Sequence, residues 1–312
     1  MIQVEGLTKY YDDFCAVDRI DFAIQKGEII GLLGPNGAGK TTTLRMLTGY
    51  FKPTAGQVKI KDFDIQEDIL AIKQLIGYLP ESAPLYPGML VYDYLDYVAS
   101  IRKLTGDAKA ERLRRLVGLC GLQGIMHKTI GELSKGLKQR VGLAHAMMSD
   151  PEILILDEPT SGLDPNQIVE IRDIIREIGR EKTVILSTHI LSEAEATCDR
   201  IVIIHQGRIV ADDRTENLKQ SGSHTRRIHL ALQNADPADA IATLSTIDGI
   251  TATASASPDT KGILGLTLTC RGTDDPRPAV YAVIKATDWI LVEFVQQTKN
   301  LETIFRELTK EN

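Results

Sequence analysis

The sequence of 312 residues has no long apolar run, only four cysteines and no excess of positive charge. No stretch approaches the ~20 apolar residues that a membrane-spanning helix needs, and the first residues lack the layout of a signal peptide. The cysteines form no CxxC pair, so neither a zinc site nor a disulfide framework is indicated. The formal net charge of −6 argues against a nucleic-acid partner, because such partners favour a concentrated basic surface. We therefore expect a cytoplasmic protein whose thiols are free and buried.

The remaining composition is that of an ordinary globular protein, with 43% hydrophobic and 25% charged residues. The chain is too long for one small core, which predicts two domains or one domain with subdomains. The best linker candidate is 219–223, which is rich in serine and glycine. It separates a first domain, 1–218, from a second, 224–312. Within the first domain, the spacing of apolar residues predicts a largely helical subdomain over 82–148.

A phosphate-loop motif lies near the start of the chain, where residues 34–42 fit GxxxxGK[ST] without a substitution. A strand pattern precedes it and a helical pattern follows, which is the context that distinguishes the motif from a chance Gly-rich turn. The glycines let successive backbone N–H groups surround a phosphate, and the helix adds its positive N-terminal end. Lys40 is predicted to reach the β- and γ-phosphates, and Thr41 to ligate Mg²⁺. The nucleotide-binding candidates of the loop are Gly34, Pro35, Asn36, Gly37, Ala38, Gly39, Lys40, Thr41 and Thr42.

Two adjacent carboxylates, Asp157 and Glu158, follow the apolar run 153–156. Four consecutive apolar residues predict a strand that is covered on both faces, as in a parallel sheet between helices. Because successive side chains of a strand point in opposite directions, the two carboxylates can do different jobs at the edge where α/β sheets bind ligands. Near the N-terminus, Tyr11 is a candidate to stack on a nucleotide base, with packing on the sheet as the alternative.

The second domain alternates strand and helix patterns in the order strand, helix, strand, strand, helix, strand. The expected strands are 227–232, 250–254, 263–269 and 289–295, with helices at 237–244 and 278–287. That order is typical of the split βαββαβ arrangement, and a further helix is expected at 301–308. Such a module serves as a ligand sensor, as a dimer brace or as a packing extension, and the sequence leaves these alternatives open.

Further motifs decide among the phosphate-loop families. Residues 133–140 resemble the signature of ABC ATPases, in a variant with lysine at the third place. The strand that ends in Asp157 and Glu158 resembles the Walker B strand, residues 161–164 resemble the D-loop, and His189 falls at the place of the switch histidine. All of these follow the family's order over residues 1 to about 218. The sequence is therefore identified as a member of the ABC ATPases, and it most resembles ATPase subunits of drug-resistance and gliding-motility exporters.

The resemblance implies an α/β fold of the P-loop NTPase class, with a RecA-like core, an antiparallel β subdomain and a helical subdomain. The small α+β domain, ferredoxin-like in its βαββαβ order, follows it. The resemblance also implies a head-to-tail homodimer. ATP would then lie between the phosphate loop of one copy and Ser134, Gly136 and Asp164 of the other. The partner would be a membrane permease, which would hold the protein at the cytoplasmic face of the inner membrane.

The family's chemistry gives the remaining candidates their roles. Glu158 would be the general base, and His189 would hold the attacking water and the γ-phosphate. Lys40, Thr41 and Asp157 would stabilise charge together with Mg²⁺. Glu81 departs from the family, where glutamine is usual, and we expect this carboxylate to keep the metal-ligating role.

Three questions stay open at this level. Lys135 either points toward the phosphate or is solvated. The tyrosines of 82–97 either dock the membrane subunit or form the core of the helical subdomain. A soluble ABC protein that acts on ribosomes or DNA is the rival class, although such proteins generally carry two cassettes, a coiled-coil insertion or zinc-binding cysteines.

Overall fold

A computed structural model describes residues 1–221, 225–254, 263–271 and 275–297. The chain divides into two compact units, of which the first is Met1–Thr215 and the second begins at Glu216. Helix α8, Thr215–Ser221, includes the first residues of the expected linker, so their backbone is helical. The helix begins at Thr215, whose hydroxyl donates to the Cys198 carbonyl at 2.7 Å, and its residue Leu218 is buried.

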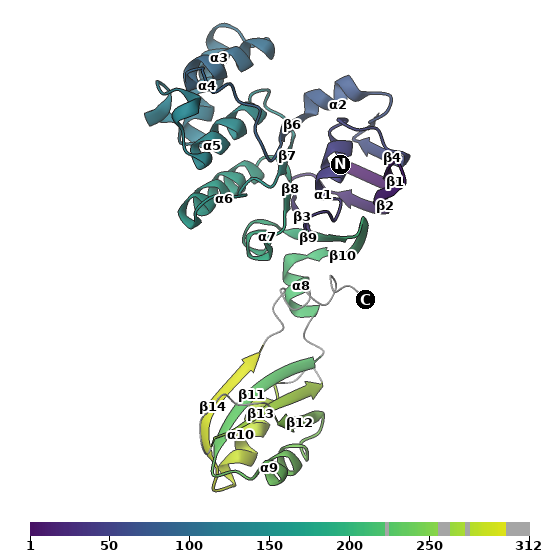
Figure 1. Ribbon diagram of the computed structural model, residues 1–312, viewed down its shortest axis with the longest axis vertical. Helices are drawn as coiled ribbons and strands as arrows, with labels where there is room; N and C mark the ends of the chain where they lie inside the picture. The colour runs from purple at the N-terminus through teal and green to yellow at the C-terminus, as the bar shows by residue number, and fades with distance from the viewer. Residues whose placement is uncertain (222–224, 255–262, 272–274, 298–312) are drawn as a thin grey trace. The chain divides into compact units, whose positions relative to one another are not determined.

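The first unit is built on a six-stranded sheet in the order β10-β9-β3-β8-β7-β6 (Figure 1). Neighbouring strands are parallel except β10, which runs antiparallel to β9. All residues of β3, β7 and β8 are buried, which accounts for their nearly continuous apolar sequences. The strands are β3 (Ile29–Leu33), β6 (Ile76–Leu79), β7 (Ile153–Asp157), β8 (Thr183–Thr188), β9 (Arg200–His205) and β10 (Arg208–Arg214).

A smaller antiparallel sheet, in the order β2-β1-β4-β5, forms the predicted β subdomain. Its strands are β1 (Ile2–Tyr11), β2 (Phe14–Ile24), β4 (Ala55–Ile60) and β5 (Phe63–Asp64). In β2 and β4, apolar side chains alternate with exposed ones, because one face of this sheet packs on the core. That core is shared with the larger sheet and with α1 (Lys40–Leu47) and α2 (Ile69–Leu75).

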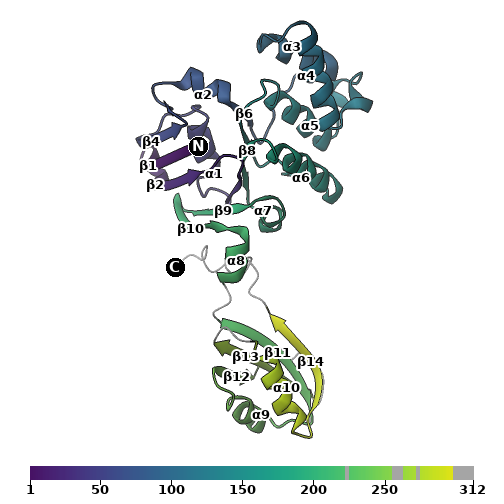
Figure 2. The ribbon, with the colours of Figure 1, turned by 180° about the vertical axis from the view of Figure 1, so that it is seen from behind.

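The predicted helical subdomain contains α3 (Val91–Ile101), α4 (Gly106–Leu119) and α5 (Lys135–Ala146). Figures 1 and 2 show these helices grouped on the opposite side of the parallel sheet from the antiparallel one. The fully buried Tyr94 of α3 joins α5 through a 2.6 Å hydrogen bond between its hydroxyl and His145 Nδ1. Burial lowers the pKa of His145, so this ring is neutral near pH 7.

Two further helices follow strands of the larger sheet and pack against it. They are α6 (Pro165–Gly179) and α7 (Leu191–Thr197). The apolar residues Ile171, Ile175 and Ile178 of α6 are buried at helical spacing. No helix within the described ranges is long and apolar enough to cross a membrane.

The second unit is one four-stranded antiparallel sheet in the order β12-β13-β11-β14, with α9 and α10 packed on it. Its elements are β11 (Thr225–Gln233), α9 (Pro237–Leu244), β12 (Ile250–Ala254), β13 (Ile263–Arg271), α10 (Arg277–Lys285) and β14 (Ile290–Gln297). Asp236 caps α9 by accepting the N–H groups of Ala238 and Asp239. The βαββαβ prediction is therefore confirmed, while the helix expected at 301–308 lies outside the described residues.

Candidate active site

A cavity of about 440 Å³ lies where the phosphate loop meets the ends of β7 and β8. It gathers residues that are far apart in the sequence, and most of the predicted nucleotide-binding and hydrolytic side chains are among them. Its lining residues are Tyr11, Phe14, Ala16, Asn36, Gly37, Ala38, Gly39, Lys40, Thr41, Thr42, Glu81, Glu158, Ser161 and His189. The cavity thus brings together many of the residues that the sequence analysis predicted to bind nucleotide or to take part in its hydrolysis.

The phosphate loop needs glycine at two of its positions for steric reasons. A Cβ on Gly34 would lie 2.2 Å from the Ile204 carbonyl oxygen, and one on Gly39 would lie 2.5 Å from the Ala16 carbonyl oxygen. Gly39 also has a φ of 105°, which side chains disfavour. No side chain caps α1, so the N–H groups of its first turn remain free to bind an anion.

Lys40 lies at the centre of the loop and is only 5% exposed. Its ammonium donates to the carbonyl oxygens of Gly34, at 2.8 Å, and Pro35, at 3.2 Å. It also pairs with Glu158 Oε1 at 3.2 Å. Gly34 and Pro35 therefore contribute carbonyl groups that hold Lys40, although neither residue lines the cavity.

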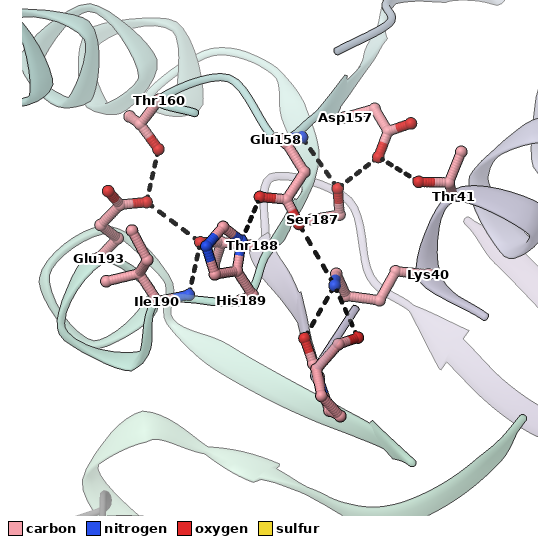
Figure 3. A network of polar contacts seen from close by, with 12 residues as sticks. Lys40, Thr41, Asp157, Glu158, Thr160, Ser187, Thr188, His189, Ile190 and Glu193 are labelled. Atoms are coloured by element: carbon pink, nitrogen blue, oxygen red, sulfur yellow. Dashed lines mark hydrogen bonds and ion pairs between the residues drawn. The ribbon is translucent and has the colours of Figure 1, made fainter. Parts of the chain in front are cut away.

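Asp157, which is 1% exposed at the end of β7, is held by two hydroxyl groups. Thr41 Oγ1 donates to its Oδ1 at 3.0 Å, and Ser187 Oγ donates to the same oxygen at 2.6 Å. Ser187 also accepts the backbone N–H of Glu158 at 2.9 Å, as Figure 3 shows. Burial, with a smaller contribution from Asp157, raises the pKa of Tyr78 to about 12, so Tyr78 adds no negative charge here.

Ser187 is a site residue that the sequence analysis did not select. It lies directly opposite Asp157 in the parallel pairing of β8 with β7. The polar end of an apolar strand is the signal that points to it. Only the strand order shows that this end meets a carboxylate.

Glu158 has an uncommon backbone conformation, with a φ of 48°. A residue other than glycine in this region costs about 1–3 kcal/mol, which the surrounding contacts must offset. Its Oε1 pairs with Lys40, and its Oε2 lies 2.7 Å from His189 Nδ1. The conformation thus places one carboxylate between the phosphate-loop cation and the histidine (Figure 3).

His189 is 40% exposed in its side chain, whereas the Glu158 side chain is 10% exposed. When the neutral ring donates from Nδ1 to Glu158, its Nε2 becomes an acceptor. The pair can therefore bind and orient a water molecule or a phosphate oxygen at the cavity wall.

The donor atoms around Thr41 fit a magnesium ion that is bound together with a nucleotide. The Thr41 hydroxyl, the Asp157 carboxylate and Glu81 on the cavity wall all offer the oxygen ligands that Mg²⁺ prefers. Within the described part of the chain, no group of three or more His, Cys, Asp or Glu residues could hold a metal ion. Substrate phosphates and water would therefore complete the coordination.

Two aromatic side chains line the cavity. Tyr11, the predicted stacking residue, makes an edge contact with Phe51, with ring centroids 5.9 Å apart. Phe14 is 64% exposed and pairs with Tyr11 across the β1–β2 hairpin. The sequence analysis missed Phe14, although an aromatic residue three positions after Tyr11 was a signal for it.

Comparison with known proteins decides the family. The family described as ABC transporter matches residues 17–161. The bacitracin transport ATP-binding protein BcrA of Bacillus licheniformis is 38% identical, over 75% of this chain and 76% of its own length. The chain belongs to the family of ABC transporter ATP-binding proteins. It is therefore an ABC ATPase, and the resemblance to drug-resistance ATPases is confirmed.

The similarity also covers the second unit of this ABC ATPase. The Nod factor export ATP-binding protein I of Burkholderia pseudomallei is 34% identical over 99% of this chain and 96% of its own length. Among solved structures, cbiO1 from Clostridium perfringens, described as part of the ABC transporter complex cbiONQ, has a TM-score of 0.65 at 29% identity. It covers 70% of this chain and 89% of its own. The predicted fold class is confirmed.

The remaining predicted nucleotide ligands of this ABC ATPase lie elsewhere in the first unit. Ser134 caps α5 by accepting the Leu137 N–H at 3.3 Å, and Asp164 caps α6 by accepting the Gln167 N–H at 2.9 Å. Gly136 is buried, and a Cβ there would lie 2.6 Å from Gln167 Cδ. Ser134, Gly136 and Asp164 do not line the cavity that contains Lys40, Glu158 and His189.

Two of the open questions concern residues whose surroundings the structure describes. The Lys135 ammonium packs beside Gly162, where a Cβ would lie 2.5 Å from it, so this lysine lies against the D-loop of its own chain. Tyr94 belongs to the core of the helical subdomain. The other tyrosines near it are exposed, namely Tyr86, Tyr92 and Tyr97.

Proposed function

We propose that this ABC ATPase is the ATP-hydrolysing subunit of an exporter, that it acts as a head-to-tail homodimer, and that it drives a separate membrane permease. One observation supports the dimer above the others. The cavity contains the phosphate loop and the hydrolytic pair, whereas Ser134, Gly136 and Asp164 lie outside it. A second copy supplies these signature and D-loop groups to the nucleotide.

ATP is the substrate, and residues of this chain bind its phosphates and activate the attacking water. The free N–H groups of α1 and the Lys40 ammonium bind the phosphates. Glu158, oriented by Lys40 and His189, accepts the proton of the attacking water. Mg²⁺, when bound, neutralises negative charge on the phosphates. Catalysis then rests on positioning and charge stabilisation, as phosphoryl transfer requires.

Glu81 ligates Mg²⁺ together with Thr41 and Asp157. Its position on the cavity wall and the oxygen donors near it support this role. Glu81→Ala is expected to raise the Mg²⁺ concentration needed for half-maximal nucleotide binding by several fold, because one ligand is lost. Glu81→Gln retains a ligating oxygen and is expected to stay near the wild-type midpoint.

The measurement for Glu81 is a Mg²⁺ titration of the fluorescence of a bound trinitrophenyl-ATP. It reports nucleotide binding and does not depend on turnover. An unchanged midpoint in Glu81→Ala would remove this residue from the metal site.

The exposed tyrosines of the helical subdomain form the docking surface for the permease. Tyr86, Tyr92 and Tyr97 are 53%, 51% and 46% exposed, and Tyr86 contacts the Tyr97 ring edge-on. Aromatic residues are enriched in the cores of protein interfaces. Docking there holds the ATPase at the cytoplasmic face of the inner membrane. The names of BcrA and the Nod factor export protein support an exporter.

Co-expression with the permease encoded nearby tests this function. We expect the two proteins to co-purify in detergent, and Tyr92→Ser together with Tyr97→Ser to reduce recovery of the complex at least about tenfold. Thr105→Ala is a control change at the residue that precedes α4, where the side chain makes no capping hydrogen bond. Co-purification with ribosomes or DNA, and not with the permease, would assign the chain to the non-transport class.

A further inference from the structure

Glu193, on the first turn of α7, links the two loops that contain the hydrolytic residues. Its Oε2 accepts a hydrogen bond from Thr160 Oγ1 at 2.5 Å and another from Thr188 Oγ1 at 3.1 Å. Thr160 follows Glu158 by two residues, and Thr188 immediately precedes His189. Figure 3 shows this carboxylate between the two segments.

Both threonines are buried, at 7% exposed for Thr160 and 1% for Thr188. Hydrogen bonds from hydroxyl groups to a carboxylate are stronger than those between neutral groups. In this buried position, the two hydrogen bonds hold the segments around Thr160 and Thr188 at a fixed distance from each other. Without the carboxylate, both hydroxyl groups would lose their hydrogen-bond acceptor.

On the Glu158 side, Thr160 lies inside a tight turn. The Ser161 N–H donates to the Glu158 carbonyl at 3.1 Å, which closes a turn with Thr160 at its third position. Glu158 begins this turn with a φ of 48°. Anchoring of Thr160 by Glu193 therefore stabilises the conformation that directs the general base toward the cavity.

On the His189 side, the Thr188 hydroxyl has two roles. It donates to Glu193 and accepts the backbone N–H of Ile190 at 3.0 Å. The residues before and after His189 are thereby connected through one hydroxyl group. Because His189 and Glu158 meet at 2.7 Å, their alignment depends on both segments that Glu193 joins.

The other oxygen of Glu193 has no role in this link. Its Oε1 is buried without a hydrogen-bond partner among the described residues, and Glu193 lines a cavity of about 280 Å³ between α6 and α7. The Nε of Arg172, on the same cavity wall, is likewise buried and unpartnered.

We propose that Glu193 is a positioning residue for ATP hydrolysis, which keeps Glu158 and His189 aligned through Thr160 and Thr188. The proposal rests on the ATPase activity of the family and does not require the exporter role. Glu193 touches neither of the two hydrolytic side chains, so its effect reaches the reaction only through the threonines.

Glu193→Ala is expected to lower kcat about 10- to 100-fold and to leave the affinity for ATP within twofold. Nucleotide binding depends on the phosphate loop, which Glu193 does not contact. Thr160→Val together with Thr188→Val, which removes the two hydroxyl groups at nearly constant volume, is expected to reproduce this effect. Adding Glu193→Ala to that double variant should then change kcat less than twofold.

Two variants separate positioning from a stabilising charge at the start of α7. Glu193→Gln keeps an acceptor at the same reach and is expected to retain most of kcat. Glu193→Asp keeps the charge in the first turn of the helix but is one methylene shorter, so it should lose the bond to at least one threonine and behave like alanine. If Glu193 acted only as a negative charge at the start of the helix, Glu193→Asp would keep a higher kcat than Glu193→Gln. Glu195→Ala, on the same helix, is the control.

The assay is steady-state ATP hydrolysis with parallel measurement of nucleotide binding and thermal unfolding. Wild-type kcat in Glu193→Ala, or equal activity of Glu193→Asp and wild type, would overturn the proposal. A wild-type protein without ATPase activity would instead contradict the proposed function, so the two failures are distinguishable.

Discussion

Glu158→Gln is expected to lower the kcat of ATP hydrolysis at least about 10²-fold, because it removes the carboxylate that is placed to accept a proton from water. Among the described residues that line the cavity, the other carboxylate is Glu81, which is assigned to the metal. The amide is similar in shape to the carboxylate and can still contact His189 and Lys40. Binding of ATP is therefore expected to be retained, and the ATP-bound dimer should accumulate.

The measurement combines steady-state phosphate release with sedimentation velocity in the presence of ATP and Mg²⁺. Glu177→Gln is the matched control, since Glu177 is exposed on α6 and pairs only with the exposed Arg180 among the described contacts. Surface pairs of this kind contribute about 0–1 kcal/mol, so the control should hydrolyse ATP at the wild-type rate. Full turnover by Glu158→Gln would remove Glu158 from the reaction.

The local features of the site could be predicted from the sequence because they depend on neighbouring residues. The phosphate loop needs glycine where the backbone approaches another strand, and this requirement leaves a visible pattern at Gly34 and Gly39. The cap at Ser134 and the buried strand before Asp157 are also local, and both are present. The prediction of this helix cap and of this strand therefore did not depend on the order of strands in the sheet.

Ser187 and Glu193 could not be selected in the same way. Ser187 meets Asp157 only because β8 pairs with β7, across a separation of 30 residues. Glu193 meets Thr160 across 33 residues, through the packing of α7 against β3 and β8. These contacts depend on tertiary structure, which the spacing of a single sequence does not determine.

The tyrosines of the helical subdomain illustrate the same limit within one helix. Tyr94 and Tyr97 of α3 are separated by less than one turn, yet Tyr94 is 1% exposed and Tyr97 is 46% exposed. Helical periodicity identifies an apolar face but does not reveal which aromatic residue the neighbouring helix covers. The hydrogen bond between Tyr94 and His145 selects the buried one.

Ser134→Asp is expected to abolish ATP-dependent dimerisation and to lower ATP hydrolysis at least about 10²-fold. Aspartate caps helices as well as serine does, so α5 should keep its N-terminus and the protein its fold. In the proposed dimer, however, the new carboxylate would face the γ-phosphate bound by the other copy. Two unit charges 4 Å apart repel by about 4 kcal/mol at an effective dielectric constant of 20, which corresponds to about a 10³-fold loss of affinity.

The dimer is best measured by sedimentation velocity in the Glu158→Gln background, where ATP is not consumed. Asp236→Ser makes the reverse exchange of capping residues at α9 in the second unit, and it should leave dimerisation and turnover unchanged. If the isolated monomer of Ser134→Asp hydrolyses ATP at the wild-type rate, the nucleotide is not shared between two copies. Membership of the family and the roles of Lys40 and Glu158 would survive that result, whereas the head-to-tail dimer would not, because Ser134 would then have no contact with the substrate.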